Sequence, residues 1–235
     1  MKKFHRILLK ISGEFLMGDQ SYGIDVKTVS RIAEEIKGIH EKGIEVCMVV
    51  GGGNIFRGVI GADYGMPRSA ADSIGMLATI MNALAFQSSL EQQGMKTRVM
   101  SAVAMPAICE AYIRRKAMRH LEKGRVVICA AGSGNPYFTT DTAAILRALE
   151  LECELLIKAT KVAGVYDSDP KTNPYAVFFS QLSYRDVIEK NLKVMDKTAI
   201  VMAQENNMPI LVCSLETEGN MEKVLFGEGV CSIIS

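Results

Sequence analysis

Three glycine-rich turns each directly follow a short apolar run in this chain of 235 residues. They are Ile11-Ser12-Gly13, Val50-Gly51-Gly52-Gly53-Asn54 and Ala131-Gly132-Ser133-Gly134-Asn135. Glycine lets backbone N–H groups approach a ligand closely, and a helix that starts beyond the turn adds donors and positive potential. If the apolar runs are parallel strands, the turns lie at one edge of the sheet, where ligands bind. The turns therefore predict a phosphate-binding edge.

The common phosphate-binding fingerprints are missing. The nearest match to G-x-x-x-x-G-K-[ST] starts at Gly53 and has Val59 where the lysine belongs. The dinucleotide pattern G-x-G-x-x-G fails at Phe56 after Gly51 and at Tyr137 after Gly132. These departures disfavour a P-loop enzyme and a standard dehydrogenase.

Three cations accompany the turns. Lys10 interrupts an apolar run just before Gly13, Arg57 follows the triple glycine, and Lys158 ends another apolar run. Cations gathered at the carboxyl ends of strands need an anion to neutralise them, and phosphate suits this role. Asp141 stands at a predicted helix start, where the helix dipole alone would stabilise its carboxylate. It could equally hold the lysines in position, and the sequence leaves both interpretations open.

No histidine or cysteine site accompanies the turns. His5, His40 and His120 all lie away from them, and the six cysteines form no Cys-x-x-Cys pair and are interpreted as buried free thiols. The chemistry should therefore need no His or Cys base, nucleophile or metal ligand. Phosphoryl transfer to a phosphate acceptor fits, because a phosphate monoester has a second pKa of about 6 and needs mainly alignment and charge neutralisation.

Seven short apolar runs alternate with segments of helical period, which predicts an α/β fold with a largely parallel central sheet. The strand candidates are Arg6–Ile11, Glu45–Val50, Thr97–Met100, Arg125–Ala130, Glu154–Lys158, Ile210–Ser214 and Val230–Ile234.

The clearest predicted helix begins after Asp25 and ends at Gly43. A second, over 70–93, carries apolar residues at spacings of three and four, namely Ile74, Leu77, Met81, Leu84, Ala85 and Leu90. Further helices are expected near 111–123, 140–151, 196–206 and 220–226, and a turn-rich hairpin over 161–182. A boundary between two lobes is expected near 151–154.

The composition is that of an ordinary globular domain, with 49% hydrophobic and 23% charged residues and a net charge of +1. It excludes a disordered chain and gives no global basic footprint for nucleic acid. The basic segment 112–120 is interpreted as a solvated or subunit-facing surface. The start of the chain imitates a signal peptide, but Lys10 cuts its apolar part short, so we expect a cytoplasmic protein. The apolar runs are also far shorter than the roughly 18 to 20 residues of a membrane span.

Together these loops resemble the bacterial uridylate (UMP) kinases of the amino acid kinase superfamily. The resemblance covers nearly the whole chain and implies a three-layer αβα sandwich. The matching segments are Leu9–Glu14, Val50–Gly58, Ala71–Thr79, Gly132–Asp141, Lys158–Val162 and Leu192–Asp196.

The resemblance also implies roles for individual residues. Lys10 and Lys158 would neutralise charge as the γ-phosphoryl of ATP moves to UMP, and Asp141 would orient them. The ATP-binding residues it implies are Lys10, Ile11, Ser12, Gly13, Gly53, Arg57, Thr160, Tyr166 and Asp169. The UMP-binding residues it implies are Gly52, Asp72, Ser133, Gly134, Asn135, Pro136, Tyr137, Phe138, Thr139 and Thr140. Mg²⁺ is expected with ATP, held mainly by phosphate oxygens and with no protein ligand named.

The family further implies a cytoplasmic homohexamer of pyrimidine nucleotide synthesis, with residues 1–150 as the UMP lobe and 151–235 as the ATP lobe. GTP and UTP are implied as effectors. Arg98 and Arg125 match the GTP-regulated members, whereas Gln87 and Glu91 replace basic groups. Ala163 replaces a carboxylate that many members carry. Two alternatives stay open: a carboxylate or carbamate kinase of the same superfamily, and a non-catalytic nucleotide-binding storage or regulatory protein.

Overall fold

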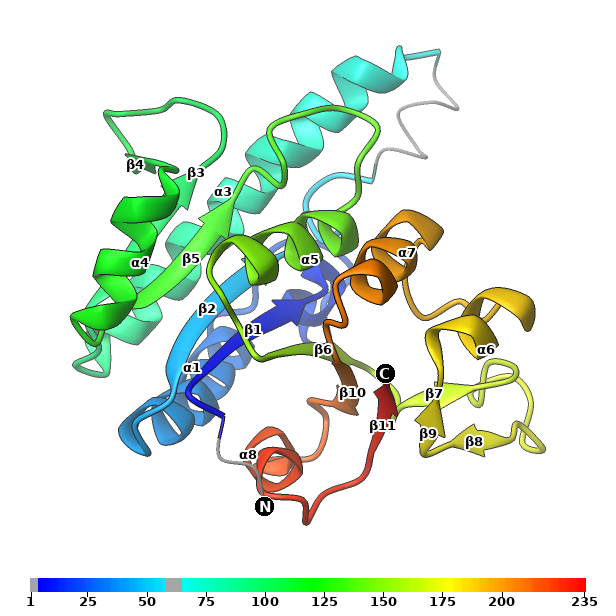
Figure 1. Ribbon diagram of the computed structural model, residues 1–235. Helices are drawn as coiled ribbons and strands as arrows, with labels where there is room; N and C mark the ends of the chain where they lie inside the picture. The colour runs from blue at the N-terminus through cyan, green and yellow to red at the C-terminus, as the bar shows by residue number, and fades with distance from the viewer. Residues whose placement is uncertain (1–3, 58–64) are drawn as a thin grey trace.

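A nine-stranded sheet runs through the middle of the molecule (Figure 1). The computed structural model describes residues 4–57 and 65–235, so Gly58 and Val59 of the predicted glycine-loop segment lie outside the described residues. All neighbouring strands are parallel except β10 and β11, which confirms the mostly parallel sheet. The strands lie in the order β4 (Glu110–Ala111), β3 (Thr97–Ser101), β5 (Val126–Ala130), β2 (Glu45–Val50), β1 (Arg6–Ile11), β6 (Leu155–Thr160), β10 (Ile210–Ser214), β11 (Cys231–Ile234) and β9 (Gln181–Leu182).

Helices cover both faces of the sheet, which confirms the three-layer αβα sandwich. One face packs against α1 (Val26–Glu41), α3 (Arg68–Gln92) and α8 (Asn220–Leu225). The other packs against α4 (Arg114–Glu122), α5 (Thr140–Glu150), α6 (Tyr184–Glu189) and α7 (Lys197–Glu205). A 3₁₀ turn, η1 (Gly13–Met17), follows β1, and β7 (Val165–Tyr166) pairs with β8 (Phe178–Phe179) as the hairpin expected within 161–182.

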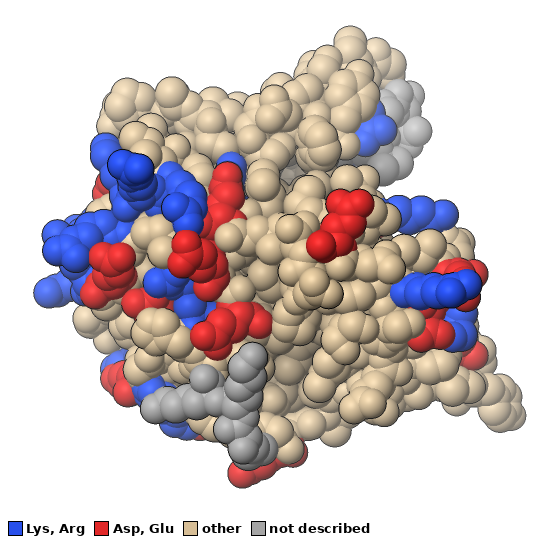
Figure 2. All heavy atoms as spheres, viewed as in Figure 1, with Lys and Arg blue, Asp and Glu red and all other residues tan. Residues whose placement is uncertain are grey.

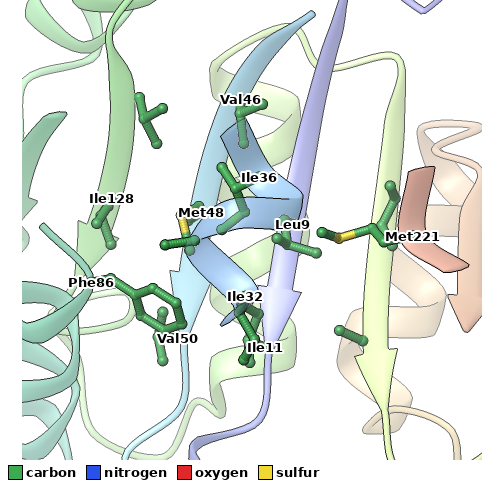
Figure 3. Packing of buried hydrophobic residues seen from close by; sticks show 14 of the residues in the cluster. Leu9, Ile11, Ile32, Ile36, Val46, Met48, Val50, Phe86, Ile128 and Met221 are labelled. Carbon is green, nitrogen blue, oxygen red and sulfur yellow. The ribbon is translucent and has the colours of Figure 1, made fainter. Parts of the chain in front are cut away.

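Side chains of β1 alternate between the two cores because successive residues of a strand point to opposite faces. Leu9 and Ile11 pack with Ile32 and Ile36 of α1, as Figure 3 shows. Leu8 packs in the opposite core, beside α5. Lys10 lies two residues beyond Leu8 and therefore leaves the sheet on the α5 side.

Helix α1 forms as the sequence predicts. The Asp25 carboxylate accepts hydrogen bonds from the backbone N–H groups of Lys27 and Thr28, at 3.2 and 3.3 Å. Gly43 ends the helix with φ of +82°, a conformation that glycine adopts without strain. A capping residue and a terminal glycine act within a few residues, so both were readable in the sequence.

Helix α3 forms as expected, but only part of the apolar stripe faces the core. Ile74, Leu77 and Met81 are exposed by 36%, 47% and 53%. The buried face contains Phe86 and Leu90 together with smaller and polar residues, namely Ala71, Ala78, Thr79, Asn82 and Ser89. Apolar residues occur all around the helix, so their spacing predicts the helix but does not identify its packed side. Among the described residues α3 alone has the length and hydropathy of a membrane span, yet its buried face packs on the sheet.

Four short elements escaped the sequence prediction: η1, β4, β9 and α6. Helix α6 carries a detectable signal, because Ser183 and Asp186 form a reciprocal capping box. The other three are too short to show a hydrophobic period.

The basic segment around α4 is interleaved with carboxylates. Arg114 pairs with Glu152 at 2.5 Å, and Arg119 pairs with Glu122 at 3.1 Å. Figure 2 shows Lys and Arg gathered on the side of the molecule where α4 lies, with Asp and Glu between them. This mixture is typical of a solvated face.

Candidate active site

Lys10 and Lys158, on the adjacent strands β1 and β6, both contact the carboxylate of Asp141. The Lys10 ammonium lies 2.6 Å from one carboxylate oxygen, and the Lys158 ammonium lies 2.8 Å from the other. Lys158 also donates to the carbonyl oxygen of Val194. Of the three cations noted in the sequence, the structure thus places two, Lys10 and Lys158, around one carboxylate. This is Asp141, for which the sequence had left two interpretations open.

Asp141 is held in place by the start of α5. The Thr139 hydroxyl caps this helix and accepts hydrogen bonds from the N–H groups of Asp141 and Thr142, at 3.0 and 3.3 Å. Asp196 in turn accepts hydrogen bonds from Thr139 and Thr142, and it also caps α7. The helix start fixes Asp141 over the sheet edge, so both interpretations of this residue apply: it lies at the helix N-terminus and it pairs with the lysines.

The charges of this cluster are unbalanced. Burial tends to raise the pKa of Asp141, but the ammonium groups of Lys10 and Lys158 outweigh it and hold that pKa below its usual value. Burial lowers the pKa of Lys158, and the attraction of Asp141 only partly opposes this effect. Two ammonium groups share one carboxylate, so the cluster keeps an excess positive charge that suits a phosphate.

A large cavity opens on one side of Lys10 and Lys158, with a volume of about 670 Å³. We call it the first cavity. Its walls come from β1, β6, the β7–β8 hairpin and the segment 191–194. Of the sequence-predicted residues, it is lined by Lys10, Ser12, Lys158, Thr160, Tyr166 and Asp169.

A smaller cavity of about 160 Å³, the second cavity, lies between the two longer glycine turns and α3. Seven of the predicted acceptor-side residues line it: Gly52, Asp72, Ser133, Asn135, Phe138, Thr139 and Thr140. Gly53, which was expected on the ATP side, also lines this cavity. The second and third glycine turns, which begin after β2 and β5, therefore line the same cavity.

Arg57 lies between the two cavities rather than in the wall of either. Its guanidinium donates to the carbonyl oxygen of Gly53, at 3.3 Å, and pairs with Glu14 at 2.9 Å. Gly53 lines the second cavity and Glu14 lines the first. A half-exposed guanidinium in this position can contact a phosphate at the junction of two ligands.

Asp72 ties α3 to the segment that follows the third glycine turn. Its carboxylate accepts a hydrogen bond from the backbone N–H of Tyr137, at 2.7 Å, and lies 3.6 Å from the guanidinium of Arg68. The same guanidinium lies over the Tyr137 ring, 5.0 Å from its centre. This carboxylate lies at the wall of the second cavity, where a ligand hydroxyl could compete with the Tyr137 N–H.

Besides Arg57 and Asp141, five predicted residues line neither cavity: Ile11, Gly13, Gly134, Pro136 and Tyr137. The Ile11 side chain is fully buried in the core, so only its backbone is available to a ligand. Gly13 is needed for packing, because a Cβ there would lie 2.6 Å from the carbonyl oxygen of Gly51. Gly134 has φ of +81°, which a glycine accommodates in the turn.

No role was predicted for the segment 191–194, although part of it belongs to the matching segment Leu192–Asp196. This segment lines the first cavity and a third cavity of about 330 Å³ beside Asp141 and Lys158. Glu14, Phe15 and Lys161 of the first cavity, and Phe56, Met76 and Thr79 of the second, were also missed. No local pattern distinguishes such wall residues, since they reach the site through the packing of their elements.

A largely parallel α/β sandwich with a Lys–Asp–Lys cluster in the wall of one cavity, and two glycine-rich turns around another, defines a phosphotransferase-type site. A model of the amino acid kinase family matches residues 5–214. The uridylate kinase of Paramagnetospirillum magneticum is 56% identical over 99% of this chain and 97% of its own, and that of Erythrobacter litoralis is 55% identical over 100% and 98%. The UMP kinase structure from Ureaplasma parvum is 39% identical, with a TM-score of 0.94 and complete coverage of both chains. The chain belongs to the uridylate kinase family within the amino acid kinases.

Proposed function

We propose that this protein is a nucleoside monophosphate kinase that transfers the γ-phosphoryl group of ATP to UMP, giving UDP and ADP. The observation that carries the proposal is the Lys10–Asp141–Lys158 cluster, whose lysines line the first cavity, while Thr140, next to Asp141, lines the second. The names of relatives that match the chain over its whole length favour UMP over a carboxylate or carbamate as acceptor. They likewise favour an enzyme over a storage or regulatory protein.

In this proposal ATP occupies the first cavity and UMP the second. The first cavity has room for a nucleotide and is lined by Lys10, Lys158, Lys161 and Lys193, which suits a triphosphate. The second cavity lies against the glycine turns, whose small residues let a phosphate approach the backbone. The UMP lobe is then residues 1–150 and the ATP lobe 151–235, joined by the continuous sheet.

Lys10 and Lys158 neutralise the phosphoryl oxygens as charge spreads over them during transfer. Asp141 keeps both ammonium groups at the same point and keeps Lys158 protonated more of the time than burial alone would. Arg57 and the Gly52–Gly53 backbone hold the facing phosphates in line. The attacking atom is an oxygen of an acceptor that is already an anion, so no residue has to remove a proton.

We further propose Mg²⁺ as the companion of ATP. Among the described residues no group of three or more His, Cys, Asp or Glu side chains comes together as a metal site. The carboxylates of Glu14 and Asp169 line the first cavity, and Mg²⁺ that accompanies a nucleotide takes one or two carboxylates besides phosphate oxygens and water. When bound, Mg²⁺ supplies charge neutralisation at the β- and γ-phosphates.

The assembly and setting follow from the family and remain part of the proposal: a cytoplasmic homohexamer in pyrimidine nucleotide synthesis, with GTP and UTP as effectors. The exposed apolar residues Ile74, Leu77 and Met81 of α3 support an interface between copies, because such a stripe is costly to leave in water. Light scattering on the purified protein tests the hexamer, and initial rates with added GTP or UTP test the effectors.

An acceptor panel tests the central proposal. ADP release is measured with MgATP and UMP, CMP, glutamate, aspartate or carbamate in turn. We expect rapid ADP formation when UMP is the acceptor and not with any of the other four compounds. Turnover with a carboxylate or carbamate would replace the proposal with the superfamily alternative, and binding of ATP and UMP without UDP would indicate a non-catalytic protein.

A further inference from the structure

The packed face of α3 carries two buried polar side chains one turn apart. Thr79 is 3% exposed and Asn82 is fully buried. Burying a hydroxyl or an amide is unfavourable unless its hydrogen bonds are replaced inside the protein. Both side chains find their partners in the glycine turns that line the second cavity.

Asn82 pairs with Asn54 of the triple-glycine turn through a reciprocal amide ring. The Asn82 amide nitrogen donates to the Asn54 side-chain oxygen at 2.7 Å, and the Asn54 nitrogen donates back at 3.0 Å. The second proton of each nitrogen goes to backbone, from Asn82 to the Gly51 carbonyl at 2.6 Å and from Asn54 to the Gly23 carbonyl at 2.9 Å. All four amide protons are used, so the pair fixes the turn to α3.

The triple-glycine turn lies so close to α3 that this fixation sets its position. A Cβ at Gly52 would lie 2.8 Å from the Ala78 Cβ and 2.9 Å from the Gly75 carbonyl oxygen. Nothing larger than glycine fits between the turn and the helix. A shift of Asn82 would therefore move the backbone of Gly52 and Gly53, which line the second cavity.

Thr79 holds the other turn. Its hydroxyl donates to the Met76 carbonyl at 2.7 Å and accepts a hydrogen bond from the backbone N–H of Ala131, at 2.8 Å. Ala131 has φ of +61°, a conformation that costs a non-glycine residue on the order of 1 kcal/mol. The bond from Thr79 helps to offset this strain at the residue where the turn begins.

We propose that Thr79 and Asn82 are positioning residues, through which α3 sets the distance between the two turns that receive the acceptor phosphate. The inference rests on the proposed function in placing UMP in the second cavity. One helix carries both anchors, so neither turn can move relative to the other without breaking a buried hydrogen bond. ATP is proposed to bind on the side built from β6 and the β7–β8 hairpin. Among the described residues, no side-chain hydrogen bond of Thr79 or Asn82 reaches these strands.

The experiment compares Thr79→Val, Thr79→Ser and Asn82→Leu with wild type. Valine keeps the shape of threonine and removes its hydroxyl, and serine restores the hydroxyl. Thr97→Val is the matched control, because Thr97 is also fully buried and hydrogen-bonded but lies at the start of β3. The dissociation constants of UMP and of a non-hydrolysable ATP analogue are measured by calorimetry, KM and kcat by ADP release, and Tm by calorimetry.

We expect Thr79→Val and Asn82→Leu to weaken UMP binding about tenfold or more while ATP-analogue binding changes less than twofold. A tenfold loss corresponds to about 1.4 kcal/mol. Thr79→Ser should retain affinity for UMP within about threefold of wild type, and Thr97→Val should lower Tm without this selectivity. An Asn54→Leu/Asn82→Leu double variant should lose little more than either single variant, since the two amides act as one unit.

Wild-type UMP affinity in Thr79→Val and Asn82→Leu would overturn the inference, and so would equal losses for both nucleotides in step with Tm. If Asn82→Leu does not fold, the valine and serine variants of Thr79 still decide. The wild-type acceptor panel tests the proposed function separately. Should another acceptor prove correct, the same ratio of acceptor to ATP affinity in these variants tests the positioning role.

Discussion

Lys10 and Lys158 are register partners on the adjacent parallel strands β1 and β6. Paired residues of neighbouring strands place their side chains on the same face of a sheet, so both ammonium groups leave toward α5. Two like charges side by side would repel each other, and the Asp141 carboxylate between them removes most of that cost. The strand register thus creates a two-cation site that needs a third, anionic partner to be complete.

Replacing Lys10 by alanine should reduce kcat by roughly 10² to 10³, the scale for one preorganised electrostatic group. The loss arises because the developing phosphoryl charge loses a fixed neighbour. Steady-state ADP release measures it, with Lys37→Ala on the exposed face of α1 as the control. Unchanged turnover would remove Lys10 from the mechanism.

Removing the side chain of Arg57 should chiefly weaken nucleotide binding, by about 1.5 to 3 kcal/mol for a charged hydrogen-bonding group. Arg57 contacts the walls of both cavities through Gly53 and Glu14, so a nucleotide phosphate at their junction would lose a partner. Titration of UMP into Arg57→Ala by calorimetry checks this, beside the exposed control Arg185→Ala. Wild-type affinity in Arg57→Ala would refute the assignment.

Asp141→Asn should lower both kcat and stability, because two buried ammonium groups lose their counter-charge. The pKa of Asp141 is lowered in the folded protein, so its ionisation stabilises the fold above the usual value of 3.8. That contribution disappears as the pH falls through the lowered pKa. The Tm of wild type should therefore fall more steeply with acid than that of Asp141→Asn. Parallel Tm curves from pH 6 downward would contradict the pairing.

As the pH is raised, kcat/KM should decline at a lower pH than the one at which an ordinary lysine loses its proton. Burial lowers the pKa of Lys158, and its ammonium is required in the proposed mechanism. The pH profile of kcat/KM for the free enzyme reports this titration. Lys158→Arg should keep its charge throughout and lack the alkaline limb, even if its rate is lower. An identical limb in both proteins would assign it to another group.

Ser232→Ala should raise KM for ATP several-fold and leave KM for UMP unchanged. The Ser232 hydroxyl is fully buried, accepts a hydrogen bond from the Val165 N–H at 2.8 Å and donates to the Phe179 carbonyl at 2.5 Å. It thereby fastens both strands of the β7–β8 hairpin, part of the first cavity wall, to β11. The substitution leaves the Val165 N–H and the Phe179 carbonyl without this partner, and an unpaired buried group costs about 1 to 3 kcal/mol. Ser89→Ala, another buried serine far along α3, is the control; equal KM values for ATP in both variants would exclude the role.

The sequence alone determined the short-range features of this protein, namely its strands, a helix cap and its glycine turns. The apolar runs became strands within one or two residues of their predicted ends, and Asp25 capped α1, because strand pattern and helix caps depend on neighbours a few residues apart. The glycine turns after β1, β2 and β5 likewise predicted the edge where a site would form. Lys10 and Lys158 were identified because a charge inside an apolar run is expensive without a partner.

Tertiary structure decided which of these features meet. Asp141 had two open interpretations until the strand order placed β6 beside β1, and Arg57 proved to lie between the cavities instead of within one. The roles of Thr79 and Asn82 depend on which side of α3 faces the sheet, and the all-round apolar character of that helix hides this choice. Contacts between residues tens of positions apart follow from strand order and helix rotation, which are properties of the whole packed chain rather than of any local pattern.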